Sequence, residues 1–149
     1  MLTCTFIGHS NCSEKISTPL YLAVERLITE EGVTRFLVGD SGNFDYYTYQ
    51  VLKKLHLRYD IQFEVVLSYL NRMTEFSYYS QDETLFPSVL ENTPPRFAIS
   101  KRNTYMLKSS QYLVCLLEHT FSNSYTFVKK ALKSGMKVIN LGAVDINSL

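Results

Sequence analysis

Short runs of apolar residues alternate along this chain with segments whose apolar side chains repeat at helical spacing. Strands that are apolar throughout are typical of a parallel sheet with helices on both faces. The crossovers of such a sheet are right-handed, which gives a doubly wound arrangement. The sequence therefore predicts an α/β fold, a Rossmann-like three-layer sandwich with a mostly parallel sheet of about five strands. The predicted strands are 2–7, 36–38, 63–67, 112–117 and 138–141.

Helix signals lie between these strands. Thr18 followed by Pro19 predicts a helix start, because the hydroxyl can cap the helix and the proline lacks only an N–H that would be unpaired there. Gly32 is expected to end that helix. Further helices are predicted over 44–57, 98–109 and 124–134.

Length and composition favour a single domain over residues 1–149. The net charge of +1 gives no strong signal for nucleic acid or an acidic membrane surface. The three cysteines and three histidines are scattered, so neither a disulfide framework nor a metal site is expected, and no cofactor is predicted. No apolar run approaches the ~18 residues of a membrane span, and the N-terminus has no basic leader. We therefore expect a cytoplasmic protein.

Residues 68–97 follow no clear strand or helix pattern. A structureless loop of this length is uncommon in a compact domain unless it has a function or contains short elements of its own. We expect an irregular but ordered lid or flap, packed by its aromatic side chains. The aromatic and proline residues of this segment are Tyr69, Phe76, Tyr78, Tyr79, Phe86, Pro87, Pro94 and Pro95.

The turn after the second predicted strand, Val38-Gly-Asp-Ser-Gly-Asn-Phe-Asp45, is a candidate ligand site. Gly39 and Gly42 allow a sharp turn and a close approach of the backbone to a ligand. A helix that starts near Asn43 would direct unpaired N–H groups at a phosphate. The spacing G-x-x-G is weaker than a complete dinucleotide-binding or P-loop motif, so an ordinary connection between strand and helix is the alternative.

Other candidates follow from the topology, because ligands of open parallel sheets bind beyond the carboxyl ends of the strands. Those ends are followed here by 8–10, 39–43, 68–69 and 118–124. We expect these segments to converge on one cleft, with separate polar loops on one edge as the alternative. Within the last segment, residues 122–124 precede a helix, which they can cap while also holding a phosphate.

A basic segment, Ile99-Ser-Lys-Arg-Asn-Thr-Tyr-Met106, is a further candidate. If its helix starts near Ser100, Lys101 and Arg102 lie in the first turn, where the helix dipole disfavours cations. A bound anion would compensate for this, whereas pairing with Glu91 or another surface acid is the alternative. On the first interpretation, replacing Arg102 with alanine weakens ligand binding and changes stability little. The predicted ligand-binding residues are Gly8, His9, Ser10, Gly39, Asp40, Ser41, Gly42, Asn43, Arg102, Asn103, His119, Ser122, Asn123 and Ser124.

Signals for catalysis are sparse. Ser10 and His9 could form a nucleophile and a base, but no third partner is recognisable. Acids at the strand ends could act as acid, base or nucleophile, although Asp40 and Asp45 are equally explained as solvent-facing residues of a turn and of a first helical turn. The candidate catalytic residues are Arg102, Asp40, Asp45 and Glu118.

Several motifs occur in a fixed order: Phe6-Ile-Gly-His-Ser, Val38-Gly-Asp-Ser-Gly-Asn-Phe-Asp45, Phe86-Pro, Leu90-Glu, and Pro95-Arg-Phe-Ala-Ile-Ser-Lys-Arg-Asn103 with Met106. Together they resemble the bacterial SLOG superfamily, which joins Smf/DprA proteins to the Lonely Guy phosphoribohydrolases, and in particular its small standalone YpsA-like members. The resemblance extends over nearly the whole chain and is most specific over 96–106. It implies a nucleotide or nucleotide-derived ligand at the strand ends and a homodimer.

Lonely Guy enzymes hydrolyse an N-glycosidic bond with an arginine on the helix before the fourth strand and a glutamate in the motif P-G-G-x-G-T-x-x-E. Arg102 matches the arginine. The second motif is replaced by Phe121-Ser-Asn-Ser-Tyr-Thr-Phe-Val-Lys129, in which Thr126 remains and Lys129 stands where the acid belongs. Without that carboxylate, a cationic transition state loses its main anionic partner. The resemblance therefore favours binding over catalysis.

Three functions remain open on the sequence. The leading hypothesis is a domain that senses or sequesters a nucleotide-derived small molecule at the strand ends. The first alternative is a hydrolase or transferase that acts on the N-glycosidic bond of a nucleoside monophosphate. The second is a protein-interaction module with a vestigial cleft.

Overall fold

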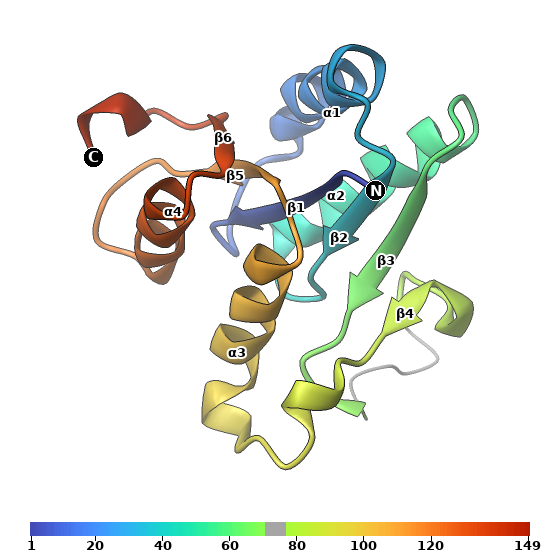
Figure 1. Cartoon of the computed structure of the whole chain (residues 1–149), viewed down its shortest axis with the longest axis vertical. Helices are drawn as coiled ribbons and strands as arrows, with labels where there is room; N and C mark the ends of the chain where they lie inside the picture. The colour runs from blue at the N-terminus through green and yellow to red at the C-terminus, as the bar shows by residue number, and fades with distance from the viewer. Residues whose placement is uncertain (71–76) are drawn as a thin grey trace.

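The computed structural model describes residues 1–70 and 77–149, and it confirms the predicted Rossmann-like α/β fold (Figure 1). In this part of the chain one sheet contains six parallel strands instead of about five. The strands are β1 (Thr3–Gly8), β2 (Arg35–Val38), β3 (Gln62–Val66), β4 (Thr84–Leu85), β5 (Tyr112–Leu116) and β6 (Lys137–Asn140). The additional strand is β4, which pairs with β3 and is too short to form a recognisable apolar run.

The strands are ordered β4-β3-β2-β1-β5-β6, so β1 lies inside the sheet between β2 and β5. The chain builds the sheet outward from β1 to β4 and then returns to the opposite side of β1. β1 pairs with β2 over residues 3–5 and with β5 over residues 4–8. Where the strand order reverses in this way, the loops after the two neighbouring strands part and leave a crevice at their carboxyl ends. That crevice lies here beyond β1 and β5.

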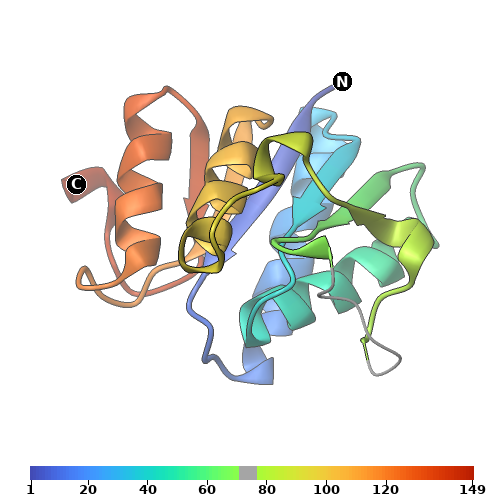
Figure 2. The same cartoon turned by 90° about the horizontal axis from the view of Figure 1, so that it is seen from below.

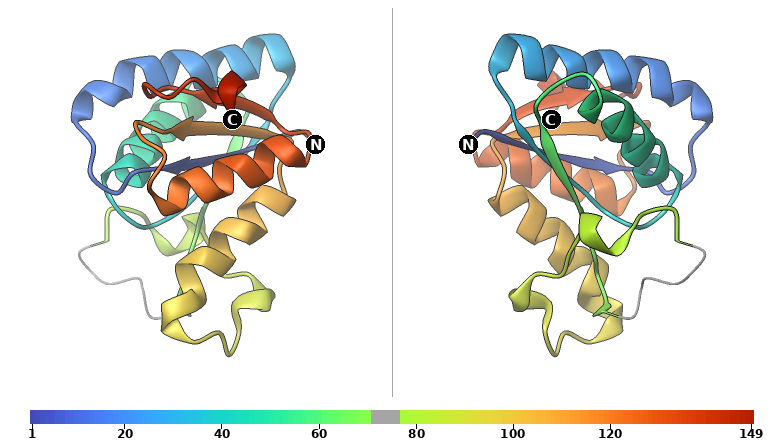
Figure 3. Two further views of the ribbon diagram at one scale, coloured as in Figure 1. Left: turned by 90° about the vertical axis from the view of Figure 1, so that its left-hand side faces the viewer. Right: turned by 90° about the vertical axis from the view of Figure 1, so that its right-hand side faces the viewer.

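Four α-helices in the described residues cover the sheet: α1 (Ser17–Glu31), α2 (Asn43–His56), α3 (Pro95–Lys108) and α4 (Asn123–Lys133). α1 and α2 pack on one face, and α3 and α4 on the other (Figures 2 and 3). Phe6 belongs to the first layer, whereas its neighbour Ile7 packs with Phe127 of α4, as the period of two in a strand requires. No helix within residues 1–70 and 77–149 combines the length and the apolar content needed to cross a membrane.

The first and third helices test the predicted helix boundaries. α1 starts within a residue of the predicted cap, and Gly32 ends it with a φ of 75°. α3 starts earlier than predicted, at Pro95, because the fixed φ of proline suits the first helical position. Arg102 therefore lies in the middle of α3 and not in its first turn. The prediction that the helix dipole opposes a cation at Arg102 is wrong.

The segment 68–97 contains short elements of its own, among them β4 and the 3-10 helices η3 (Gln81–Glu83) and η4 (Ser88–Leu90). The ring of Tyr78 contacts those of Tyr49 and Tyr79 edge to face, and Tyr79 is buried. The prediction that aromatic side chains pack this segment on the domain is confirmed for these residues. Phe76 lies outside the described residues, and the role of the segment as a lid stays a prediction.

Glu83 links this segment to α2. Its Oε1 accepts hydrogen bonds from the Tyr49 hydroxyl at 2.6 Å and from the Ser80 backbone N–H at 2.9 Å. Its Oε2 lies 2.9 Å from the Lys53 ammonium. Burial favours the neutral carboxyl, but the hydrogen bonds outweigh it and lower the pKa of Glu83 to about 2.

We expect Glu83→Gln to lower the free energy of unfolding by about 2 kcal/mol at neutral pH, because hydrogen bonds to charged groups contribute about 1.5–3 kcal/mol each. The folded pKa lies below the ordinary value of 4.5, so this stabilisation is present above pH 4.5 and disappears as the pH falls toward 2. Urea denaturation over this pH range measures it. Glu31→Gln, in an exposed pair with Lys137, is the control and should change little. A loss that stays constant down to pH 2 would contradict a role for the charge.

Candidate functional site

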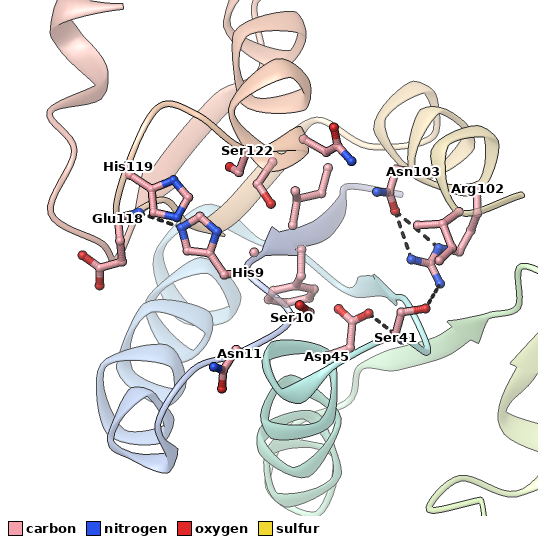
Figure 4. Close-up of a pocket in the computed structure, with 16 residues that line it drawn as sticks. His9, Ser10, Asn11, Ser41, Asp45, Arg102, Asn103, Glu118, His119 and Ser122 are labelled. Carbon is pink, nitrogen blue, oxygen red and sulfur yellow. Dashed lines mark hydrogen bonds between the residues drawn. The ribbon is translucent and has the colours of Figure 1, made fainter. Parts of the chain in front are cut away.

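A pocket of about 650 Å³ lies at the carboxyl edge of the sheet, where the loops after β1 and β5 part (Figure 4). We call it the β1–β5 pocket. Three of the four segments expected to converge, 8–10, 39–43 and 118–124, contribute residues to it, whereas Ser68 and Tyr69 do not line it. Among the predicted site residues, it is lined by Gly8, His9, Ser10, Ser41, Asp45, Arg102, Asn103, Glu118, His119, Ser122, Asn123 and Ser124.

The glycine turn after β2 contributes less to the pocket than its sequence suggests, since Gly39, Asp40, Gly42 and Asn43 do not line it. A Cβ at Gly39 would lie 2.7 Å from the Asp45 carboxylate and 2.8 Å from the guanidinium carbon of Arg102. Gly42 has a φ of 91°, and a Cβ there would lie 2.6 Å from the backbone of Ser10. The two glycines thus allow the protein to pack on itself at this turn.

The N-terminus of α2 is also satisfied from within the protein. The Ser41 N–H donates to Asp45 Oδ2 at 2.9 Å, and the Asn43 N–H donates to the Ser10 carbonyl at 2.7 Å. Two of the backbone donors that the sequence suggested for a phosphate are therefore already used. A carboxylate of the chain occupies the position where the helix dipole favours negative charge.

Arg102, which lines one wall of the pocket, forms a buried ion pair. Its Nη1 lies 2.5 Å from Asp40 Oδ1, and the two side chains are 3% and 0% exposed. Asn103 Oδ1 accepts from Nε at 3.3 Å and from Nη2 at 3.2 Å. Asp40 and Asp45 are both buried, so their interpretation as solvent-facing residues is wrong. The charge of Arg102 is compensated within the protein before any ligand binds.

Asp45 has an environment that disfavours its charge. Burial raises its pKa to about 6, while the nearby Arg102 and the hydrogen bond from Ser41 act in the opposite direction. Asp40 adds to the increase through like charge. A carboxyl group with a pKa near 6 in a pocket can exchange a proton close to neutral pH.

Stacked rings form the opposite wall. The His9 and His119 rings stack with centroids 4.4 Å apart, and Phe121 stacks on the outer side of His119 at 3.8 Å. The Glu118 backbone N–H donates to His9 Nε2 at 2.9 Å, so the proton of neutral His9 lies on Nδ1. Burial and the neighbouring His119 lower the pKa of His9, with Glu118 acting against them. His9 is therefore largely uncharged at neutral pH.

Glu118, a candidate catalytic acid, has its carboxylate engaged elsewhere. Its Oε2 accepts from the Ala143 N–H at 2.9 Å. In Figure 4 the carboxylate points away from Arg102 and Asp45. Of the three candidate acids, Asp45 is the one whose carboxylate faces the other polar groups of the pocket.

The N-terminus of α4 closes the top of the pocket. Ser122 caps the helix by accepting from the Tyr125 N–H, and α4 has no acidic residue in its first turn. Both Asn123 and Ser124 line the pocket beside it. The positive end of the α4 dipole therefore faces the pocket without an acidic residue in its own first turn, whereas Asp45 lies at the corresponding end of α2.

Sequence reasoning missed four residues that line the pocket, Phe6, Ile7, Asn11 and Ile99. Ile99 lies one turn before Arg102 and Asn103 on α3, and the correct start of this helix at Pro95 would have indicated it. Asn11 follows Ser10 in an irregular loop without a comparable signal. Within residues 1–70 and 77–149, no three histidine, cysteine or acidic side chains gather as metal ligands would.

No family model matches the chain, and no curated protein matches it in sequence. Solved structures match it in fold. DNA processing protein A (DprA) from Streptococcus pneumoniae aligns with 99% of this chain at a TM-score of 0.69 and 11% identity, and this chain spans about half, 53%, of DprA. The molybdenum cofactor carrier protein from Chlamydomonas reinhardtii aligns with 94% of this chain, and 76% of its own, at a TM-score of 0.61 and 14% identity. These likenesses show a DprA-like α/β fold.

The ion pair with Asp40 changes the expected effect of Arg102→Ala on stability. Arg102→Ala should lower the free energy of unfolding by about 3–5 kcal/mol, because it removes the guanidinium that pairs with the buried Asp40 carboxylate. This replaces the expectation that stability changes little. Chemical denaturation measures the effect, and Lys101→Ala, at the exposed neighbouring position, should stay within about 0.5 kcal/mol of the parent. Equal stability of both variants would exclude a structural role for the pair.

Proposed function

We propose that this protein binds a nucleotide or a nucleotide-derived small molecule in the β1–β5 pocket, as a sensor or a sequestering domain. The observation that carries the proposal is the position of the pocket at the reversal of strand order, where open α/β sheets bind their ligands. Its volume of about 650 Å³ lies within the range of about 300–1,000 Å³ that is usual for small-molecule sites.

The charges at the pocket suggest where a phosphate binds. Asp45 occupies the N-terminus of α2 and repels an anion there. The N-terminus of α4 carries hydroxyl and amide groups from Ser122, Asn123 and Ser124 and has no acid in its first turn. Backbone N–H groups and the dipole of α4 favour a phosphate at that end.

The remaining walls suit a planar ring. His9 lines the pocket with His119 stacked on one face of its imidazole, and Ile99, Phe6 and Ile7 add apolar surface. Offset stacking on such rings stabilises aromatic ligands without selecting a particular base. A nucleotide combines the two features that this pocket offers, an anionic group and a planar ring.

A second candidate, hydrolysis of the N-glycosidic bond of a nucleoside monophosphate, is favoured by one observation. Asp45 lines the pocket and has a pKa of about 6, which suits a general acid or base. Incubation with nucleoside monophosphates followed by chromatography of the free base tests this reaction. If the parent protein releases free base and Asp45→Asn does not, the protein is an enzyme and Asp45 is required for the reaction.

We also propose a homodimer and, as an alternative function, a protein-interaction role. A homodimer is implied by the family resemblance alone, and light scattering measures it. A protein-interaction role with a vestigial pocket is the outcome that a failed ligand search would favour.

Thermal denaturation in the presence of nucleotides tests the proposed function. At a ligand concentration about 100 times the Kd, binding to the folded state should add about 2.7 kcal/mol to the free energy of unfolding. Nucleoside monophosphates, diphosphates and dinucleotides are compared with inorganic phosphate and free bases. No stabilisation by any phosphorylated nucleoside would reject the proposal.

Ser122→Asp tests the phosphate position at α4. Aspartate caps a helix as well as serine does, so the free energy of unfolding should stay the same or rise. The added charge should weaken nucleotide binding at least tenfold, as titration calorimetry measures. Ser13→Asp is the matched control, since Ser13 caps η1 (Glu14–Ile16) outside this pocket and also accepts a backbone N–H. An unchanged Kd in Ser122→Asp would remove α4 from the phosphate site.

A further inference from the structure

Only one of the two carboxylate oxygens of Asp45 accepts a hydrogen bond from the described part of the chain. Oδ2 accepts the Ser41 N–H at 2.9 Å. Within the described residues Oδ1 has no hydrogen-bond partner, and the side chain lines the β1–β5 pocket although the residue is only 7% exposed. Figure 4 shows the carboxylate between Ser10 and Ser41, facing the interior of the pocket. An acceptor in such a position is ready for a donor from a ligand.

Ionisable groups from four other parts of the chain surround Asp45. Arg102 of α3 attracts its charge, and Asp40, which follows β2, repels it. Cys12 of the loop after β1 and Tyr78 of the segment 68–97 are close enough for the charge of Asp45 to act on them. Arg102 is bound to Asp40, so among these groups one guanidinium faces two carboxylates while Asp45 is ionised.

We infer that Asp45 determines which part of a ligand enters this end of the pocket. It accepts a hydrogen bond from a neutral donor of a nucleoside, either a ribose hydroxyl or an amine of the base, and it excludes phosphate from the N-terminus of α2. The inference rests on the proposed function and adds an orientation to it. The phosphate lies toward α4 and the donor group toward α2.

Electrostatics and hydrogen-bond chemistry support this assignment. An ionised carboxylate only accepts hydrogen bonds, so it matches O–H and N–H groups and not phosphate oxygens. Two anions in a partly desolvated pocket repel each other strongly. Protonation of Asp45 removes both the repulsion and part of the acceptor capacity. Its raised pKa of about 6 places this change within an accessible pH range.

Titration calorimetry with guanosine tests the donor contact, because guanosine has no phosphate whose own titration would interfere. We expect its affinity for the parent protein to fall about tenfold between pH 7.5 and pH 5. Asp45→Asn should bind guanosine about tenfold more weakly than the parent at pH 7.5 and should lose the pH dependence. Asp60→Asn removes an exposed carboxylate on the loop after α2 and should behave as the parent protein does.

Two further ligands identify the donor. Inosine lacks the amine at position 2 of the base, and 2′,3′-dideoxyguanosine lacks the 2′ and 3′ hydroxyls of the ribose. The ligand whose affinity is insensitive to Asp45→Asn is the one that lacks the contacted group. Inorganic phosphate should bind Asp45→Asn severalfold more tightly than the parent, since the repelling charge is gone.

The outcomes separate this inference from the proposed function. If nucleotides bind but Asp45→Asn keeps the parent affinity and the parent pH profile, the inference is overturned and the proposed function stands. If the parent protein binds no nucleoside or nucleotide, both are rejected. Asp45→Asn should melt at the parent temperature or above it, because it removes a buried charge. The pH profile of the parent protein tests the donor contact even if the variant does not fold.

Discussion

The position of β1 in the interior of an all-parallel sheet constrains the rest of this molecule. β1 is hydrogen-bonded on both edges, and helices cover both of its faces. Polar side chains that serve a ligand cannot lie along such a strand without a large desolvation cost. They are placed instead where the strand ends, at His9 and Ser10, and the loop after β5 supplies the opposing residues from its own end. The pocket is a consequence of this arrangement of strands.

The pairing of charges within the protein makes the α2 end of the pocket different from the α4 end. Arg102 is paired with Asp40 in one wall, and Gly39 leaves the space that Arg102 and Asp45 fill. Asp45 serves as the internal anion at the N-terminus of α2. The first turn of α4 has no such acid. The proposed ligand, with one anionic and one hydrogen-bond-donating end, would match this asymmetry.

Local patterns predicted most of the fold. Apolar runs identified β1, β2, β3, β5 and β6. In β1, β2 and β5 the run is continuous because almost every residue is buried, whereas β3 and β6 are less buried. β4 was missed since two residues at a sheet edge carry no period. The start of α3 was misplaced by three positions, from 98 to 95, because the apolar repeat and not the Pro94-Pro95 pair was used to set it. The assumption that this helix starts near Ser100 misplaced Arg102 relative to the helix dipole.

The sequence by itself determined the α/β class, the order of elements and the set of loops that meet at one edge of the sheet. These depend on the period of apolar residues and on the handedness of crossovers, which are local properties. Only the tertiary structure decided what each polar residue in those loops does. Arg102 and Asp40 are 62 positions apart and pair through packing of α3 against the turn after β2. Such long-range contacts settle whether a charge faces a ligand or another charge of the chain, and no local pattern encodes them.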